Sequence, residues 1–295
     1  MFGINQLKTV ALLGLLSGLI VLAGYYLVGN ETGLLIGLIV AAFTSISSWY
    51  FSDQAALATY RAHPIAREQA PELYDTVQRL SDRAGIPMPK LFVVPTDSPN
   101  AFATGRDPDH ATIAVTQGIV KLLSKEELDS VLAHELTHVK NRDTLIQAVA
   151  GTLAGAITYL GQILTFGALF GAGGGRGRQG NPLGVLFLIV LAPLSASLIQ
   201  MAISRTREFA ADQGSAEITG NPLALVSALQ KLEELKEKMP LQGNPAFSPL
   251  FIVNPLSPQG LQVLFLTHPP TEDRIRKLKE LAEQQTSQKA EPSAA

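Results

Sequence analysis

The fold is decided by the stretch Ser124-Lys-Glu-Glu-Leu-Asp-Ser-Val-Leu-Ala-His-Glu-Leu-Thr-His-Val-Lys140. Ser124 and Glu127 match a capping box, in which each side chain bonds the backbone N–H of the other residue, so a helix begins here. Apolar residues then recur at helical spacing, at Leu128, Val131, Leu132 and Val139. The stretch therefore predicts a helix that carries two histidines and a glutamate.

His134 and His138 lie four residues apart, so their side chains share one helix face about one turn apart. Two imidazole nitrogens in that arrangement can reach one metal ion at about 2.0–2.1 Å. Glu135 lies beside them and is expected to act as general base, taking a proton from water activated by the ion and later giving it to a leaving amine. The pattern indicates metal-assisted hydrolysis with one Zn²⁺ per chain, although another divalent ion stays open.

A catalytic zinc site keeps three protein ligands and one open position, so a third ligand is needed. The chain has no cysteine, which leaves histidine, aspartate and glutamate. The strongest candidate is Glu208, in Arg205-Thr-Arg-Glu-Phe-Ala-Ala-Asp212. Asp212 lies four residues further along the same expected helix. We expect it to orient a ligand histidine by accepting the second N–H of its ring.

Three other histidines have weaker claims. His63 and His110 are expected in polar loops and without a chemical role. His268, in Thr267-His-Pro-Pro-Thr271, could stabilise a tetrahedral oxyanion or could simply structure the turn. The sequence leaves both readings of His268 open.

Four long runs lack charged residues: 9–30, 32–52, 144–175 and 179–204. Each is long enough to cross about 30 Å of hydrocarbon, which takes about 20 helical residues. Charged residues make up 16% of the 295-residue chain, whereas soluble domains carry about a quarter. The runs therefore predict an integral membrane protein, and the net charge of -2 argues against a nucleic-acid partner.

The first two runs predict a transmembrane hairpin that turns at residues 29–31. Trp49, Tyr50 and Phe51 follow at its exit, where an aromatic belt is expected. The third and fourth runs either span the bilayer or enter and return on the same side. Basic residues flanking the runs favour a cytoplasmic location for the polar segments, although Arg176 and Arg178 count against it.

The polar segments predict a mainly α-helical fold with a small antiparallel β-sheet. A helix over 68–84 precedes short strands at 91–94, 101–103 and 112–116, and another helix begins at Asn221-Pro222. An exposed edge strand of this sheet could bind an extended substrate, or the sheet could be purely structural. The expected organisation is a membrane hairpin at 1–53, a catalytic segment at 54–143, a second membrane hairpin at 144–204 and a second catalytic segment at 205–295.

The expected topology brings the candidate ligands together. His138 precedes the third run by about seven residues, roughly 10 Å of helix, and Glu208 follows the fourth run by about four residues, roughly 6 Å. If these runs form a hairpin, its two ends lie on the same membrane side. His134, His138 and Glu208 then converge at one membrane surface.

The chain closely resembles the HtpX family of membrane zinc proteases. The resemblance rests on paired apolar segments at the start and on four motifs: Asn100-Ala-Phe-Ala-Thr-Gly105, His134-Glu-Leu-Thr-His138, Ser204-Arg-Thr-Arg-Glu-Phe-Ala-Ala-Asp212 and Thr267-His-Pro-Pro-Thr-Glu-Asp-Arg274. It implies a zincin-type endopeptidase that degrades misfolded membrane proteins under stress. It also implies His134, His138 and Glu208 as zinc ligands, Glu135 as the catalyst, and a bacterial plasma membrane location with the active site facing the cytoplasm.

Other classes fit the sequence less well. A processing protease with a defined substrate, similar to the prenyl-protein proteases, stays possible, although four apolar runs are few for its many-helix chamber. An inactive membrane scaffold or chaperone would have no need for Glu135 beside the metal. A transporter usually needs ionisable residues inside its membrane helices, and the four runs have none. Oligomeric state is not predicted.

Overall fold

The computed structural model describes residues 30–150, 205–236, 238–239, 250–253 and 269–290, together with Phe247 and scattered positions between 7 and 25. Part of the third apolar run, all of the fourth, and His268 lie outside these residues. The elements in chain order are α2 (Glu31–Thr59), β1 (His63–Pro64), α3 (Pro71–Ala84), β2 (Lys90–Val94), β3 (Ala101–Gly105), η1 (Pro108–His110), β4 (Ala111–Thr116), α4 (Gln117–Leu122), α5 (Lys125–Lys140), α8 (Arg205–Thr219), α9 (Pro222–Lys236) and α10 (Thr271–Ala290).

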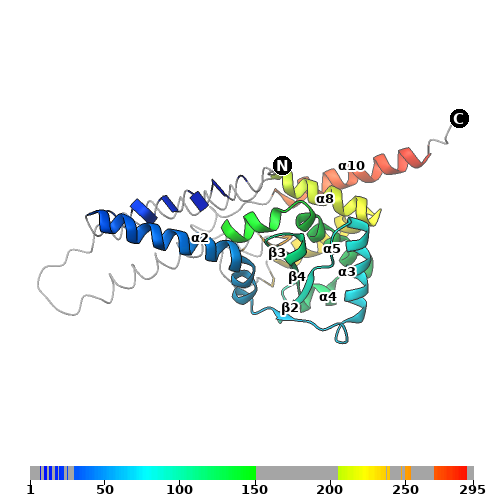
Figure 1. The fold of residues 1–295 in the computed structure, drawn as a ribbon. Helices are drawn as coiled ribbons and strands as arrows, with labels where there is room; N and C mark the ends of the chain where they lie inside the picture. The colour runs from blue at the N-terminus through cyan, green and yellow to red at the C-terminus, as the bar shows by residue number, and fades with distance from the viewer. Residues whose placement is uncertain are drawn as a thin grey trace, which may run out of the picture.

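Helix α2 projects from the rest of the molecule, as Figure 1 shows. It begins at Asn30, whose side chain accepts a hydrogen bond from the backbone N–H of Gly33. Residues Glu31–Phe51 form the one helix, within the described part of the chain, that is long and apolar enough to span a bilayer. Only 12% of its most apolar window is buried in the protein. A helix apolar on all sides and left uncovered is typical of a lipid-facing span.

The first apolar run lies against α2. Ser17 Oγ is 2.9 Å from Ser45 Oγ. Further along, the Cβ of any side chain at Gly37 would lie 2.8 Å from Val21 Cα, so the two backbones approach closely. The contacts pair increasing residue numbers in one segment with decreasing numbers in the other, as an antiparallel hairpin requires. The predicted count of four membrane helices is not established by the described residues.

The four-stranded sheet has the order β1-β2-β4-β3. The prediction of an antiparallel sheet is wrong, because β2 and β4 run parallel, with Leu91 opposite Ile113. β3 pairs antiparallel with β4, and β1 antiparallel with β2. After β2, the chain first forms β3 at the edge of the sheet. It then turns back at Gly105 (φ 131°) and forms β4 between β2 and β3. β4 therefore runs parallel to β2. This direction depends on the order of the strands in the sheet, which the sequence of each strand does not indicate.

Helix α5 lies at the centre of the main core. It packs against β3 and against α3, α8 and α9. Val131, Leu132 and Leu136 of α5 are fully buried in this core. The capping box predicted at Ser124 and Glu127 is present, with both reciprocal hydrogen bonds formed. The helix that carries the histidines is therefore held from all sides.

A second cluster joins the end of α2 to the sheet. The Tyr60 ring meets Phe251 edge-on with centroids 4.8 Å apart, and Phe251 meets Phe102 of β3 in the same way at 5.1 Å. Ala56 and Leu57 of α2 are buried in the same cluster. Helix α2 is thus packed directly onto the strand beside the histidine helix.

Candidate metal centre

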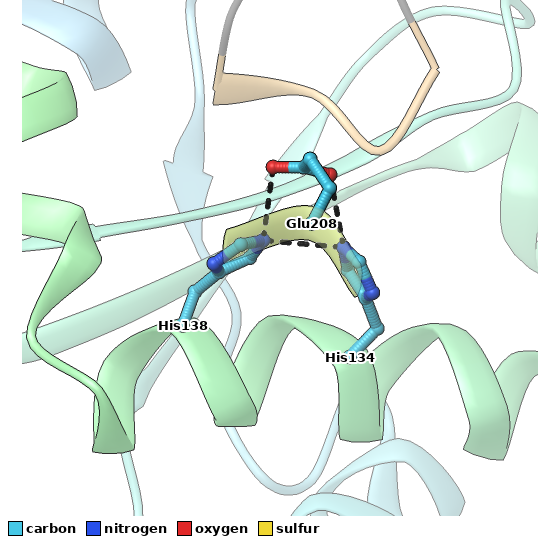
Figure 2. A group of neighbouring side chains, drawn as sticks. All are labelled: His134, His138 and Glu208. Atoms are coloured by element: carbon cyan, nitrogen blue, oxygen red, sulfur yellow. Dashed lines mark hydrogen bonds and ion pairs between the residues drawn. The ribbon is translucent and has the colours of Figure 1, made fainter. Parts of the chain in front are cut away.

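Three buried side chains converge between α5 and α8 (Figure 2). His134 Nε2 and His138 Nε2 are 3.2 Å apart, and the Glu208 carboxylate oxygens lie 3.7 Å from His134 Nε2 and 3.5 Å from His138 Nε2. Donors around a tetrahedral ion at 2.0–2.1 Å are about 3.3–3.4 Å apart. The three distances fall within a few tenths of an ångström of that spacing. Two neutral imidazoles and one carboxylate thus form a donor set that fits a zinc-sized divalent ion.

The spacing between the two helices is fixed by close packing. A Cβ on Gly214 of α8 would overlap the side chain of Thr137 on α5. The next residue of α8, Ser215, donates a 2.6 Å hydrogen bond from its Oγ to the backbone carbonyl of Ser130, which lies two turns before Thr137 on α5. Only a glycine in α8 allows the helices to approach this closely. The approach brings Glu208 to the two histidines.

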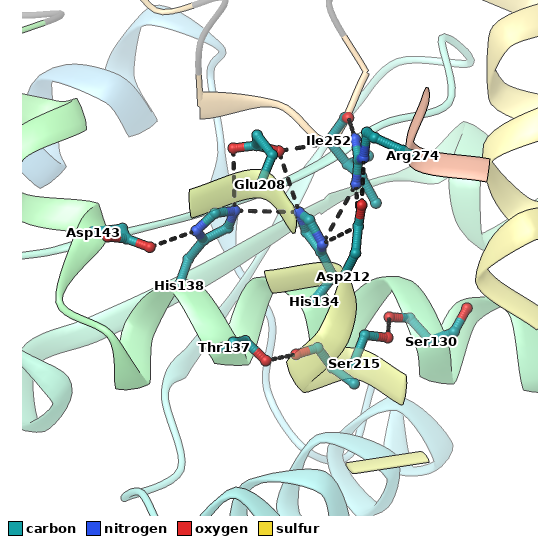
Figure 3. Close-up of polar contacts among 11 residues, drawn as sticks. Ser130, His134, Thr137, His138, Asp143, Glu208, Asp212, Ser215, Ile252 and Arg274 are labelled. Carbon is teal, nitrogen blue, oxygen red and sulfur yellow. Dashed lines mark hydrogen bonds and ion pairs between the residues drawn. The ribbon is translucent and has the colours of Figure 1, made fainter. Parts of the chain in front are cut away.

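Asp212 lies behind His134, as Figure 3 shows. Its Oδ1 is 3.0 Å from His134 Nδ1. The Arg274 guanidinium makes a two-pronged contact with the same carboxylate, through Nε at 2.9 Å and Nη2 at 2.6 Å. Burial alone would raise the pKa of Asp212, but Arg274 and His134 outweigh it and hold that pKa below its usual value. Asp212 is therefore an ionised acceptor that turns Nε2 of His134 toward the other donors.

A matching arrangement lies behind His138. Asp143 Oδ2 is 3.0 Å from His138 Nδ1, and Asp143 Oδ1 is 3.7 Å from Arg207 Nη1. Sequence reasoning missed Asp143, Arg207 and the role of Arg274. Two signals were available in the sequence: a carboxylate five residues after His138, and the arginine that ends the Thr-Glu-Asp-Arg274 motif.

Glu135 is buried beside the two histidines. Its Oε1 accepts no hydrogen bond from the part of the chain that the structure describes. Burial raises the pKa of Glu135 to about 8, although His138 and a hydrogen bond from the Ala103 backbone N–H oppose the shift. A divalent cation at the neighbouring donors would pull this pKa down toward neutrality. A carboxylate with one oxygen left without a hydrogen bond can exchange a proton near neutral pH.

The two histidines differ in their metal-free protonation. Burial lowers the pKa of His134 to about 4, so its ring is neutral. Burial opposes the charge on His138 as well, but the carboxylates of Glu208 and Asp143 outweigh it and raise that pKa to about 9. A ligand imidazole must be neutral, so metal binding at neutral pH would release the proton of His138.

The outer edge of β3 faces this site. The backbone N–H of Ala103 bonds Glu135, and the carbonyl of Gly105 accepts a 2.9 Å hydrogen bond from Thr144 Oγ1. At the other end of the strand, Ile252 N–H donates to the carbonyl of Ala101. The expected edge strand therefore lies beside Glu135, but its first residues are already paired with the chain around Phe251.

None of the three remaining histidines belongs to the cluster as the structure describes it. His63 is exposed in β1, and His110 is half-exposed in η1, where its ring lies 2.7 Å from Asp107. Neither belongs to the candidate metal group. His268 lies outside the described residues, so its two sequence readings stay as they were.

The fold and the site define a metalloprotease built around a His-Glu-x-x-His helix. The sequence matches the model for Peptidase family M48 over residues 67–282. It is 57% identical over 282 residues to the Protease HtpX homolog of a Nostoc species, which covers 95% of this chain and 98% of that protein. It is 47% identical over 281 residues to the Protease HtpX homolog of Thermococcus sibiricus, covering 94% and 96% of the two chains. The chain therefore belongs to peptidase family M48 and, within it, to the HtpX proteases.

A solved structure shares the fold. The crystal structure of S. mikatae Ste24p superposes with a TM-score of 0.50 at 19% identity, covering 93% of this chain and 65% of that one. At this identity the likeness concerns the fold alone. Together, the family membership and the exposed α2 make the chain a membrane metalloprotease, a hydrolase that acts on proteins in a lipid environment.

Proposed function

We propose that the chain is a zinc endopeptidase in which His134, His138 and Glu208 hold the ion and Glu135 is the general base. The observation that carries the proposal is the spacing of the three donors, 3.2–3.7 Å, with a buried and unengaged glutamate oxygen beside them. Zinc, when bound, activates water and polarises the scissile carbonyl.

The protein's own residues then perform the proton transfers. Glu135 accepts a proton from the attacking water and passes it to the nitrogen of the leaving amine, so that the peptide C–N bond breaks and the two charges balance. The Ala103 N–H holds the carboxylate in place during both transfers. Asp212 and Asp143 keep the two ligand rings in the tautomer that presents Nε2. His268 remains a candidate for stabilising the oxyanion.

The proposed substrates are misfolded or membrane proteins, cleaved as part of quality control under stress. Support comes from the HtpX relatives and from the packing of α2 onto β3, which places the site close to a membrane helix. A processing protease with one defined substrate is the alternative. An inactive scaffold is less favoured, since Glu135 and all three metal donors are in position.

We further propose a multi-pass protein of the bacterial inner membrane with both catalytic segments in the cytoplasm. The proposed division is 1–53 and 144–204 as membrane hairpins, and 54–143 and 205–295 as the two halves of the catalytic unit. The convergence of α5 and α8 supports it, because their residues come from opposite sides of the second hairpin.

The deciding experiment compares the native chain, Glu135→Gln and Glu126→Gln, each purified in detergent, stripped with a chelator and given zinc. Glu126 is exposed on the same helix and serves as the matched control. We expect zinc to restore cleavage of an unfolded protein by the native chain and the control. Glu135→Gln should bind one zinc but cleave at least about 100-fold more slowly. Equal cleavage by all three would refute the assignment of Glu135.

A further inference from the structure

The catalytic end of the membrane span carries an aromatic group. Trp49 and Tyr50 end the apolar part of α2, with 43% and 47% of their surfaces exposed. The span Glu31–Phe51 has 21 residues, about 30 Å at 1.5 Å per residue, which matches the hydrocarbon thickness. Trp49 and Tyr50 therefore lie at the depth of the lipid headgroups, on the side of the bilayer that holds the metal centre.

Arg106 reaches this aromatic group from the sheet. It follows Gly105, the last residue of β3, where the positive φ turns the chain back toward β4. Its guanidinium carbon lies 5.0 Å from the centroid of the Tyr50 ring and 5.9 Å from that of Trp49. Both distances are within the range of cation–π contacts. A cation from the catalytic unit is thus held at headgroup depth by two rings of the membrane helix.

Within the described structure, Arg106 forms one ion pair, with its neighbour Asp107. The Nε–Oδ2 distance of 3.6 Å is beyond hydrogen-bond distance. The other oxygen of Asp107 accepts the backbone N–H of His110 at 2.9 Å and lies 2.7 Å from that residue's ring. Among the described residues, the Arg106 guanidinium makes no hydrogen bond within the usual limit. Ring contacts occupy the face of a guanidinium and leave its N–H edge available.

We propose that Arg106, with Trp49 and Tyr50, binds the phosphate of an anionic lipid headgroup in the leaflet next to the catalytic unit. A guanidinium edge matches the paired oxygens of a phosphate, and aromatic side chains at this depth bracket headgroups. The occupant is a lipid because the two rings belong to the end of a bilayer span, where headgroup phosphates are concentrated.

The contact also has a consequence for the active site. Arg106 directly follows Gly105, which is bonded to Thr144, and lies three residues after Ala103, which bonds Glu135. Lipid bound at Arg106 would fix the height of the β3 edge, and so of Glu135, above the membrane surface. This consequence rests on the proposed function, whereas the lipid contact itself does not.

Trp49 gives a direct readout, because it is the only tryptophan in the chain. The full-length protein is placed in phosphatidylcholine vesicles that contain either brominated phosphatidylglycerol or brominated phosphatidylcholine at equal mole fraction. Quenching of Trp49 fluorescence then measures which lipid lies against it. We expect about fivefold selectivity for the anionic lipid in the native chain, as one cation at the surface provides. Arg106→Gln should remove most of this selectivity, and Arg106→Lys should keep part of it.

Arg276→Gln is the matched control, because Arg276 is an exposed arginine on α10 and its loss changes the net charge equally. It should keep the native selectivity. Undiminished quenching of Arg106→Gln by brominated phosphatidylcholine would show that the variant is folded and inserted. Full anionic selectivity in Arg106→Gln would overturn the proposal, as would loss of selectivity on addition of millimolar inorganic phosphate. No outcome depends on zinc or on cleavage, so failure here is separate from failure of the proposed protease mechanism.

Discussion

Each of the two candidate metal-binding histidines has a carboxylate behind it and an arginine behind the carboxylate. The sequence of contacts is His134–Asp212–Arg274 on one side and His138–Asp143–Arg207 on the other. Arg274 favours the ionised form of Asp212 despite burial, and an ionised carboxylate accepts the Nδ1–H of the ring. The lone pair of Nε2 is then left for the metal. The orientation of the two candidate ligand rings is thus set by charges that lie outside the three metal donors.

Asp212→Asn and Asp143→Asn should each weaken zinc binding by about 10–100-fold, because an amide is a poorer acceptor and does not fix the ring tautomer. Competition with a chromogenic chelator measures the affinity. Asp129→Asn is the control, since Asp129 lies on α5 but pairs with Arg79 of α3, outside the metal donors, and should have no effect. Unchanged affinity in both site variants would mean that the carboxylates only stabilise the fold.

The candidate ligand residues could be picked out from the sequence because the information is local. His134, Glu135 and His138 lie within one turn of one helix, and Glu208 and Asp212 within one turn of another. Arg274 comes from α10 and meets Asp212 across 62 residues of chain. Such a contact depends on how α8 and α10 cross, which no spacing in the sequence encodes. The site geometry supports the predicted roles, which stay to be tested by substitution.

At the scale of elements, the crossing of α5 and α8 sets the spacing of the three candidate metal donors. The helices touch where Gly214 faces Thr137, whose Oγ1 is already held by the carbonyl of Ala133 in its own helix. Thr137 therefore cannot swing aside freely. Any enlargement at Gly214 must be accommodated by separation of the two helices, which moves Glu208 away from the histidines.

Gly214→Ala should lower the stability by about 1–3 kcal/mol, as overpacking does, and reduce zinc affinity at least about tenfold. Removing the obstructing side chain in the double variant Gly214→Ala/Thr137→Ala should recover most of both losses. Thermal unfolding with and without zinc measures the two effects together. If the double variant is no better than the single one, the helix contact does not set the ligand spacing.

The start of α5 is held by a charged cluster. Glu127 caps the backbone N–H of Ser124 and also bonds Ser227 and Lys231 of α9. Burial would raise the pKa of Glu127, but these bonds outweigh it and lower that pKa from 4.5. A carboxylate with a lowered folded-state pKa stabilises the protein above its unfolded pKa and loses that contribution as the pH falls through the folded value.

Glu127→Gln should therefore cost about 1–3 kcal/mol of unfolding free energy at pH 7, and the deficit should shrink once the pH falls below 4.5. Denaturant titrations of the detergent-purified chains at several pH values test this. Glu280→Gln, an exposed carboxylate on α10, should show no such dependence. A deficit that stays constant down to acid pH would assign the effect to packing rather than to charge.

The elements themselves were largely predictable. The capping box placed the start of α5, and Asn221-Pro222 placed the start of α9. The strands predicted at 101–103 and 112–116 correspond to β3 and β4, which pair antiparallel. The direction of β2 relative to β4 was wrong, because strand patterns indicate which residues are buried but not which strands become neighbours.

At the scale of the whole molecule, the single helix α2 connects the candidate membrane span to the part of the chain that carries the metal donors. α2 leaves the span after Phe51 and ends at Thr59, where Tyr60 enters the aromatic cluster with Phe102 and Phe251. The catalytic unit is thus attached to the end of α2 opposite Glu31. If α2 spans the membrane, Glu31 and the proposed active site lie on opposite sides of it, so locating Glu31 also locates the active site.

The absence of cysteine from the chain allows this orientation to be measured directly. Single cysteines are introduced at Glu31, at the end of the span away from the metal donors, and at Lys279, exposed on α10. With the catalytic unit in the cytoplasm, a membrane-impermeant maleimide should label Glu31→Cys in intact spheroplasts. It should label Lys279→Cys only in inverted vesicles or after permeabilisation. Arg67→Cys, beside α3, should be labelled under the same conditions as Lys279→Cys, because both belong to the proposed catalytic unit.

Labelling of Lys279→Cys and Arg67→Cys in intact spheroplasts would show that the orientation is the reverse of the proposed one. Opposite behaviour of those two positions would instead contradict the joining of residues 54–143 and 205–295 into one unit on one side of the membrane.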